Sequence, residues 1–331
     1  MAKGGDIMRK FSGPLAHMIK RHLELRRSLG FIMTGAEHTL GVFDKYMLKC
    51  YPKAKKVTRS MVIGYLKTIL HLHSTSRSME VSHIRQFCFF LFQFMPDTYI
   101  PERSLVPPGN GKIKPHIYTE TEIYKLIQLA KQLTPPGSLR PHTYATVIGL
   151  LWVTGLRIGE IVRLNIEDVD LENRLIYVQR TKFCKSRVVP ISKSSVIVLS
   201  DYKEKRRSFG HDNSNTAPFF VNERANRLIR ILVGHTFRNL TKQLEIKTEQ
   251  GGYPRLHDLR HTFATRWLNE FYQTGKDPTA YLPVLATYLG HVKVAYTERY
   301  LHISVQLLEK AGQKFKKYIS TDRTLKSGGR L

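Results

Sequence analysis

The chain has 331 residues, enough for two domains with separate apolar cores, and its 53 Lys and Arg against 26 Asp and Glu give a formal net charge of +27. This charge exceeds what solubility requires and indicates a polyanionic partner, for which nucleic acid is a better candidate than an anionic membrane surface. Three cysteines without CxxC spacing argue against a disulfide scaffold and a zinc ribbon, and the most apolar run, residues 87–95, is about half of the ~20 residues that a membrane span needs.

Helical periodicity runs through residues 1–100. Apolar side chains recur at the spacing of one helix face, with basic side chains largely off that face, in four stretches at residues 14–29, 40–47, 62–69 and 84–91. The pattern predicts a small N-terminal helical bundle. Because the N-terminus also lacks the apolar core of a signal peptide, we expect a cytoplasmic protein without a membrane partner.

Residues 101–117 form the predicted linker, because prolines and glycines in this region interrupt any helix. Thr119 followed by Glu122 is a capping-box signature, so a helix is expected to begin there. The second domain is predicted over residues 118–318. The polar residues 319–331 are expected to form a flexible tail.

The second domain combines helices with a few strands. Residues 143–164 have the composition of a largely buried helix interrupted near Gly155, and residues 175–179 and 187–191 are typical of two strands paired around a turn. Helical patterns resume after Asn222 and continue to the end. We therefore expect a mainly α protein with a small β-sheet, in which an α+β domain follows the helical bundle.

Two motifs bring basic and imidazole groups onto one helix face. In TGLRIGE, residues 154–160, Arg157 and Glu160 are three apart, although a surface ion pair is the ordinary explanation of such spacing. In HDLRH, residues 257–261, His257 shares a face with Arg260 and with His261. The HxxxH spacing also suits zinc, but the general-base Glu of HExxH is replaced by Asp.

A third motif, LGHVKVAYTERYLHI, contains Tyr300 nine residues after His291. Taken alone, one of sixteen tyrosines is most simply a core or interface residue. In the order TGLRxGE, a lysine in a strand turn, HDLRH, LGH and TERYLH, however, the chain resembles the tyrosine recombinase (phage integrase) family over most of residues 118–310. The longer interval between Arg260 and His291, filled by NEFYQTGKDPTAYLP, resembles members found on transposable elements.

This resemblance implies a fold and an activity. The N-terminal bundle is expected to be a core-binding (SAM-like) domain that clamps DNA together with the tyrosine recombinase catalytic domain. The implied reaction is site-specific breakage and rejoining of double-stranded DNA at recombination sites, without a metal or another cofactor. Family members act as four protomers around two duplexes, which implies a homo-tetramer on DNA and leaves room for accessory recombinases.

The resemblance also assigns catalytic residues. Tyr300 would be the nucleophile that forms a 3′-phosphotyrosine, Arg157 and Arg260 would clamp the nonbridging oxygens of the scissile phosphate, and His257 and His291 would complete the pocket. A metal-free site of this kind is chemically reasonable, because fixed cations stabilise the negative charge of the transition state and an Arg fork suits phosphate oxygens.

The remaining roles are those of the proton donor, the proton acceptor and the side chains that support the catalytic residues. Lys182, after the strand at residues 175–179, matches the family's hairpin lysine that protonates the leaving 5′ oxygen, with Lys185 as the alternative. A tyrosine with a reference pKa near 10 needs help to ionise, and we select His257 as the base. Glu160 and His261 would be supporting residues, although His261 is equally well explained as a packed structural side chain.

Candidate phosphate contacts in the N-terminal domain rest on charge and position alone, and each can equally be a solvated side chain: Lys20, Arg21, Arg26, Arg27, Lys53, Lys55 and Lys56. Beyond Tyr300, the spacing of Val305, Leu308 and Phe315 predicts the apolar stripe of a terminal helix. The resemblance implies that such a helix docks on a neighbouring protomer, and the ordinary alternative is packing on its own domain. Two other functions stay open, a recombinase-like DNA-binding protein without activity and a type IB topoisomerase.

Overall fold

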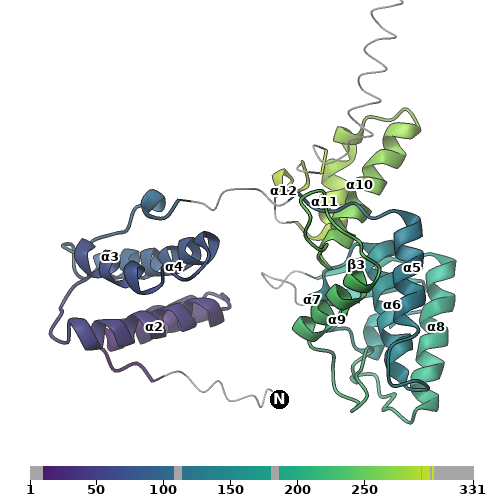
Figure 1. The fold of residues 1–331 in the computed structure, drawn as a ribbon, viewed down its shortest axis with the longest axis horizontal. Coiled ribbons are helices and arrows are strands. Elements are labelled where there is room, and N and C mark those ends of the chain that lie inside the picture. The colour runs from purple at the N-terminus through teal and green to yellow at the C-terminus, as the bar shows by residue number, and fades with distance from the viewer. Residues whose placement is uncertain (1–9, 108–113, 180–185, 292, 299, 302–331) are drawn as a thin grey trace, which may run out of the picture. The chain divides into compact units, whose positions relative to one another are not determined.

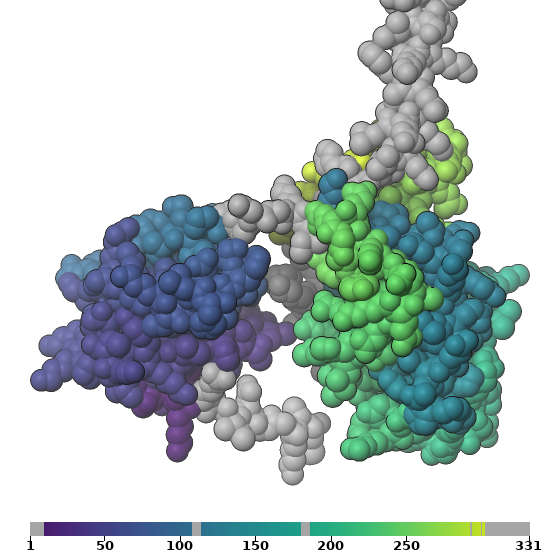
Figure 2. Space-filling model, viewed as in Figure 1, coloured from purple at the N-terminus to yellow at the C-terminus, as the bar shows by residue number. Residues whose placement is uncertain are grey.

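The computed structural model describes residues 10–107, 114–179, 186–291, 293–298 and 300–301 (Figure 1). The chain divides into two compact units, Met1–Lys112 and Ile113–Leu331. Figure 2 shows their side-chain volume, with the first unit in purple to blue and the second in teal to yellow. Within the described ranges, no helix is both long and apolar enough to cross a bilayer. Lys182, Lys185, the apolar stripe after Tyr300 and the predicted tail lie outside these ranges.

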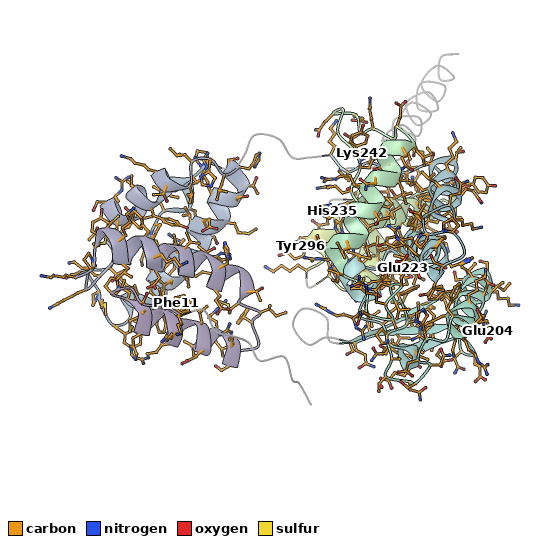
Figure 3. The ribbon with its side chains drawn as sticks, turned by 60° about the horizontal axis from the view of Figure 1, so that its bottom comes forward. Phe11, Glu204, Glu223, His235, Lys242 and Tyr296 are labelled. Carbon is orange, nitrogen blue, oxygen red and sulfur yellow. The ribbon has the colours of Figure 1, made fainter. Side chains whose placement is uncertain are left out.

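The first unit is the helical bundle that the periodicity predicts. Its four α-helices are followed by a short 3-10 helix: α1 Ala16–Ser28, α2 Thr34–Cys50, α3 Arg59–Thr68, α4 Ser74–Phe92 and η1 Arg103–Leu105. Their apolar faces meet in one core, in which the ring of Phe43 packs edge-on against Tyr65 with centroids 5.2 Å apart. Phe11, labelled in Figure 3, joins this core ahead of α1. The Asp44 carboxylate holds that entry segment by accepting hydrogen bonds from two backbone N–H groups, at 2.8 and 3.0 Å.

In the second unit, helices pack around the buried helix α6, Leu139–Thr154. The long helices packed against it include α5 Glu120–Ala130, α8 Lys193–Ser208 and α10 Asp258–Gln273, while α9 Arg230–Gln243, which carries His235 and Lys242 in Figure 3, packs on α5. The predicted start of α5 is confirmed. Thr119 Oγ1 accepts a hydrogen bond from the Glu122 N–H at 3.2 Å, and Glu122 Oε2 accepts one from the Thr119 N–H at 2.8 Å.

The predicted interruption near Gly155 is confirmed. Helix α6 runs over Leu139–Thr154, Gly155 takes the left-handed conformation at φ +60°, and α7 follows at Ile158–Ile161. A Cβ on Gly155 would lie 2.4 Å from Cδ1 of Phe263 on α10. Only glycine therefore allows the chain to turn at this point against α10.

The small sheet is antiparallel with strand order β1-β2-β3: β1 Val169–Asp170, β2 Leu175–Val178 and β3 Arg187–Pro190. The two predicted strands are paired as expected, with Val178 opposite Arg187. Strand β1 and helix α8 have no counterpart in the sequence analysis. Strand β1 has only two residues, and the buried positions of α8 include a serine and an arginine, so no apolar stripe marks that helix.

The last described elements carry the LGH and TERY motifs. After α10 come the 3-10 helix η3 Pro278–Tyr281, helix α11 Leu282–Leu289 and the single turn α12 Ala295–Glu298, with the 3-10 helix η2 Ile166–Asp168 lying earlier in the unit. The long interval between Arg260 and His291 thus contains most of α10, followed by η3 and α11. Leu268 of α10 and Leu285 of α11 share a small apolar cluster with Tyr300.

Candidate active site

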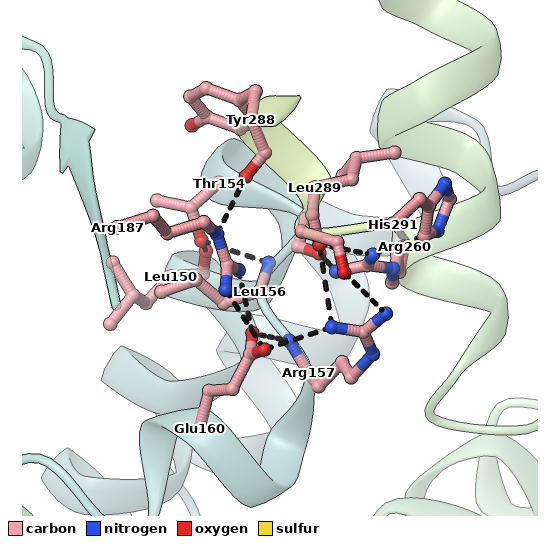
Figure 4. Close-up of polar contacts among 12 residues, drawn as sticks. Leu150, Thr154, Leu156, Arg157, Glu160, Arg187, Arg260, Tyr288, Leu289 and His291 are labelled. Atoms are coloured by element: carbon pink, nitrogen blue, oxygen red, sulfur yellow. Dashed lines mark hydrogen bonds and ion pairs between the residues drawn. The ribbon is translucent and has the colours of Figure 1, made fainter. Parts of the chain in front are cut away.

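Arg157 and Glu160 form the first part of the site, at the turn between α6 and α7 (Figure 4). Glu160 Oε2 accepts a hydrogen bond from the Arg157 backbone N–H at 2.9 Å, and Oε1 accepts one from Arg157 Nη1 at 3.0 Å. The Glu160 side chain is 6% exposed, whereas that of Arg157 is 39% exposed. The buried carboxylate therefore holds a guanidinium group that solvent, or a ligand, can still reach.

Glu160 has a second cationic partner, Arg187 of β3. Arg187 Nη1 donates to Glu160 Oε1 at 3.1 Å and Nη2 donates to Oε2 at 2.8 Å, while Nε donates to the carbonyl oxygen of Tyr288 at 2.7 Å. Burial alone would raise the pKa of the Glu160 carboxyl, but the hydrogen bonds and charges of Arg187 and Arg157 hold that pKa below its usual value. The carboxylate is therefore ionised at neutral pH.

The carboxyl end of α11 meets the same guanidinium groups. The Leu289 carbonyl oxygen accepts from Arg260 Nη2 at 2.6 Å and from Arg157 Nη1 at 3.4 Å, and the Gly290 carbonyl oxygen accepts from Arg157 Nη2 at 3.3 Å. The last carbonyls of a helix lack intrahelical partners and carry partial negative charge, so cations are favoured there. The end of α11 thereby gathers side chains from three different elements.

Arg260, on α10, is the most buried of these cations, at 1% exposure. Nη1 donates to the Gly155 carbonyl oxygen at 2.8 Å, and Nη2 lies 3.0 Å from His291 Nε2. Burial and the nearby Arg157 charge lower the pKa of Arg260 to about 10, so the group stays cationic at neutral pH. Because a guanidinium only donates, His291 Nε2 must accept, which leaves the imidazole proton on Nδ1. Nδ1 then donates to Thr297 Oγ1, 2.8 Å away.

Three aromatic contacts connect the histidines to Tyr300. His261 is 1% exposed, and its ring centroid lies 4.9 Å from that of His257 and 5.4 Å from that of Tyr300. The His291 ring lies 6.1 Å from the Tyr300 ring at an interplanar angle of 17°. The phenol ring of Tyr300 is therefore packed beside the imidazoles of His261 and His291, and Tyr300 is only 2% exposed.

His257 immediately precedes α10 and is exposed to solvent as a residue. The protein surrounding its imidazole, and secondly the charge of Arg260, lower the pKa of His257 to about 4. A neutral imidazole at pH 7 can accept a proton. The described contacts connect this ring to Tyr300 by way of His261.

Most catalytic candidates from the sequence thus come together in the second unit. Hydrogen bonds link Arg157, Glu160, Arg260 and His291, and ring contacts link His257, His261 and Tyr300. Their chemical roles remain predictions. Among the described residues, no three His, Cys, Asp or Glu side chains form a group that could hold a metal ion.

Arg187 and Thr297 were not predicted as members of this network. Arg187 is the first residue of the strand predicted over residues 187–191, and Thr297 lies within TERYLH without a predicted role. The signal that could have identified Thr297 is its position six residues after His291, across a turn. Arg187 is 27 positions from Glu160 and contacts it only after the intervening chain has folded.

The basic candidates of the first unit are partly engaged within that unit. Arg27 pairs with Glu37 at 2.7 Å and Lys56 with Asp97 at 3.3 Å, and the Arg26 guanidinium lies 3.8 Å from the centroid of the Phe31 ring. The Lys56–Asp97 pair is exposed and therefore contributes little to stability, whereas Glu37 is buried beneath Arg27. A role in DNA binding remains a prediction for all seven.

Comparisons with known proteins identify the relatives of the chain. Residues 117–306 match the Phage integrase family. Two putative integrase/recombinases of Sinorhizobium fredii, y4rB and y4rE, are 32% and 34% identical over 304 and 309 residues, which cover 90% and 93% of this chain and 96% and 97% of the relatives. The tyrosine recombinase XerA of Pyrococcus horikoshii is 26% identical over 281 residues, covering 85% of this chain and 88% of the relative.

Solved structures show the same fold. The XerH site-specific recombinase bound to a palindromic difH substrate matches with a TM-score of 0.63 at 18% identity, covering 90% of this chain and 84% of that one. The Tn1549 transposon integrase in complex with circular intermediate DNA matches with a TM-score of 0.63 at 17% identity, covering 90% of this chain and 99% of that one. With a family match over more than half of its length and two relatives above 30% identity, the chain belongs to the phage integrase family and is a tyrosine recombinase.

Proposed function

We propose that this protein recombines specific sites in double-stranded DNA, using Tyr300 as the nucleophile. The observation that carries the proposal is the meeting of Arg157, Arg260 and His291 at the end of α11, with the Tyr300 ring packed against His291. Two guanidinium groups and an imidazole at one point suit the anionic oxygens of a phosphodiester.

The two arginines are suited to different parts of phosphate binding. Arg157 makes only long contacts to the α11 carbonyls and is partly exposed, so an incoming phosphate oxygen can replace those contacts with stronger, charge-assisted bonds. Arg260 is buried, where low polarisability strengthens its field. Together they would stabilise the extra negative charge of the pentacoordinate transition state.

The reaction balances without an added energy source. The Tyr300 phenolate oxygen forms a bond to phosphorus as the bond from phosphorus to the 5′ oxygen breaks, and Lys182 supplies a proton to the departing 5′ oxygen. His257 takes the phenol proton, with His261 the imidazole in contact with the phenol ring. The reverse steps, with a 5′ hydroxyl from another strand, rejoin the DNA. Because the phenol is buried here, the segment that carries it must shift to expose the oxygen to DNA.

A role in a mobile element and a multimeric assembly are the finer parts of the proposal. The names of the Sinorhizobium fredii integrase/recombinases and of the transposon integrase support the first. A homo-tetramer on paired recombination sites, joined in some reactions by accessory recombinases, would allow two duplexes to exchange strands. The helical first unit, with its basic side chains, would serve as the core-binding DNA-binding domain.

The test is covalent capture of the DNA target. Affinity-tagged protein is incubated with sheared genomic DNA from the organism that encodes it, denatured and recovered, and the DNA that stays attached is sequenced. We expect one enriched sequence, with the protein linked to a 3′ end, and a nicked duplex of that sequence should trap the enzyme. Tyr300→Phe should bind the same duplex yet form no adduct.

Other outcomes would point to the alternatives. Binding of the duplex without any adduct by the wild-type protein would favour a catalytically silent DNA-binding protein. Adducts spread without sequence preference, together with relaxation of any supercoiled plasmid, would favour a type IB topoisomerase. An adduct formed at full level by Tyr300→Phe would refute the choice of nucleophile.

A further inference from the structure

We propose that Arg187 is a positioning residue for strand cleavage. Its positive charge balances the negative charge of the Glu160 carboxylate, so that Arg157 can present its full positive charge to the scissile phosphate. The inference rests on the proposed function, because it concerns how the phosphate-binding cation is held. Arg187 belongs to β3, whereas Arg157 and Glu160 lie at the turn into α7.

The two arginines share both oxygens of one carboxylate. Glu160 Oε1 accepts from Arg157 Nη1 at 3.0 Å and from Arg187 Nη1 at 3.1 Å, while Oε2 accepts from the Arg157 backbone N–H at 2.9 Å and from Arg187 Nη2 at 2.8 Å. Two guanidinium charges and one carboxylate leave a net charge of one positive unit. Without Arg187 the net charge would be zero, and the Glu160 charge would cancel that of Arg157.

Exposure separates the two roles. The Arg187 side chain is 11% exposed and points its fork at Glu160, whereas the Arg157 side chain is 39% exposed. Figure 4 shows Arg187 and Arg157 converging on the Glu160 carboxylate. Arg187 therefore acts on the phosphate through Arg157 and does not bind the phosphate itself.

Arg187 also holds the end of α11. Its Nε donates to the Tyr288 carbonyl oxygen at 2.7 Å, directly before the two carbonyls that contact Arg157. Its guanidinium fills the space beside Gly290, where an added Cβ would lie 2.8 Å from Nη1. One side chain thus connects strand β3, the Glu160 carboxylate and the turn that leads to His291.

The experiment compares two scissile linkages in the duplex identified by covalent capture. One is the natural phosphodiester, and the other is a methylphosphonate, tested as each separate stereoisomer, in which a methyl group replaces one anionic oxygen. The rate of adduct formation is measured in a single turnover. We expect Arg187→Gln to slow cleavage of the phosphodiester by about 100-fold, the scale of one lost electrostatic contact to a transition state.

The charge of the substrate gives the decisive readout. The methylphosphonate has less negative charge to stabilise. On this linkage Arg187→Gln should therefore reduce the rate of adduct formation by less than about tenfold, and so should Arg157→Ala. Because Arg187 acts through Arg157, the double variant should be no slower than Arg157→Ala alone. A purely structural defect would slow both substrates equally.

Arg227→Gln is the matched control. Arg227 also bonds backbone carbonyls in the second unit, at 2.9 Å to Val162 and 3.2 Å to Leu164, and its other guanidinium nitrogen donates to Asn165. Arg227→Gln should lower thermal stability and change the rate of adduct formation by the same factor on both linkages. Thermal unfolding of every variant identifies those that fail to fold, and Arg187→Met, which also removes the positive charge, replaces Arg187→Gln if the latter does.

Three results would overturn the inference. The first is a cleavage rate of the Arg187 variant within about threefold of the wild-type rate, a much smaller reduction than the expected electrostatic effect. The others are an equal rate reduction on both linkages, or rate reductions that multiply in the double variant. Each requires a wild-type protein that forms the adduct. Absence of the wild-type adduct would instead count against the proposed function.

Discussion

The two nitrogens of His291 have fixed and different partners. Nε2 accepts from Arg260, and Nδ1 donates to Thr297 on the turn that leads to Tyr300. For His291 to donate to a phosphate oxygen through Nε2, that nitrogen must separate from Arg260 and gain a proton. Arrival of the phosphate can drive this change, because the negative charge stabilises an imidazolium and draws Arg260 toward the phosphate oxygens. His291 is thereby connected both to the proposed phosphate site and to the segment that carries Tyr300, the proposed nucleophile.

Gly290 allows the first residue-scale prediction. Gly290→Ala must adopt φ +68°, which L side chains disfavour, and must push the Arg187 guanidinium away from Glu160. The displaced group is the end of a flexible side chain, so we expect a stability loss of only about 1–2 kcal/mol, mostly from backbone strain. Adduct formation should fall by at least about tenfold, because Arg157 loses its support.

Gly275→Ala is the control for this prediction. Gly275 has a similar φ of +77°, but an added Cβ there meets no described atom within 4 Å. Thermal unfolding and single-turnover cleavage are measured for both variants. Similar stability losses with a cleavage defect only at Gly290 are expected, whereas equal cleavage rates would show that the contact with Arg187 is unimportant.

Local spacing explains which residue contacts could be predicted from the sequence. Arg157 and Glu160 are three apart, and one turn of backbone places them together. Arg187 reaches Glu160 over 27 residues, and Arg260 reaches the Leu289 carbonyl over 29. Such contacts depend on how α6, β3, α10 and α11 pack, which no local pattern encodes. The backbone carbonyls of α11 carry no side-chain signature at all.

Elements were predictable where burial follows a regular period. Helix α5 has a capping box and an apolar stripe, and its start was predicted to the residue. Helix α8 buries only Ser195, Leu199, Tyr202 and Arg206, spaced four, three and four residues apart. The positions have helical spacing, but two of the four residue types are polar. Tertiary packing makes that face internal, and the composition does not reveal it.

Helix α1 supports a prediction about pH. His22 is 3% exposed and packs against the rings of Phe87 and Phe90 of α4. Burial, and secondly the Arg26 charge, lower the pKa of His22 from 6.5 to about 4. As the pH falls below 6.5, the unfolded chain binds a proton that the folded chain does not, so stability decreases toward pH 4. At pH 5 the loss should be about 2 kcal/mol relative to pH 7.5.

His22→Leu should remove this dependence while keeping an apolar contact with α4. Chemical unfolding of the first unit is followed at pH 7.5 and pH 5 in the wild-type protein, in His22→Leu and in the exposed control His17→Gln. On acidification, we expect the free energy of unfolding to fall by about 2 kcal/mol less in His22→Leu than in the other two proteins. Equal losses in all three proteins would show that His22 is not the titrating group.

At the scale of the whole molecule, the two units have separate apolar cores. The core of the first unit shares no residue with those of the second among the described residues, and the candidate active site lies wholly in the second unit. The charge of +27, by contrast, is a property of the entire chain. Composition could therefore predict a polyanionic partner, while the chemistry required the ordered motifs of residues 154–300.

The separation of the cores predicts that each unit folds and binds DNA by itself. Fragments 1–112 and 113–331 should each unfold cooperatively, and each should bind the target duplex more weakly than the intact chain.

Because every phosphate contact releases counterions, the logarithm of the association constant falls linearly with the logarithm of salt concentration, with a slope of roughly −0.9 per contact. If both units contact phosphates, the slope for the intact chain should approach the sum of the two fragment slopes. The measurement is a fluorescence anisotropy titration at several salt concentrations. A 113–331 fragment with the affinity and slope of the intact chain would rule out DNA binding by the first unit, since the basic side chains of α1 and of the segment after α2 would then contribute nothing.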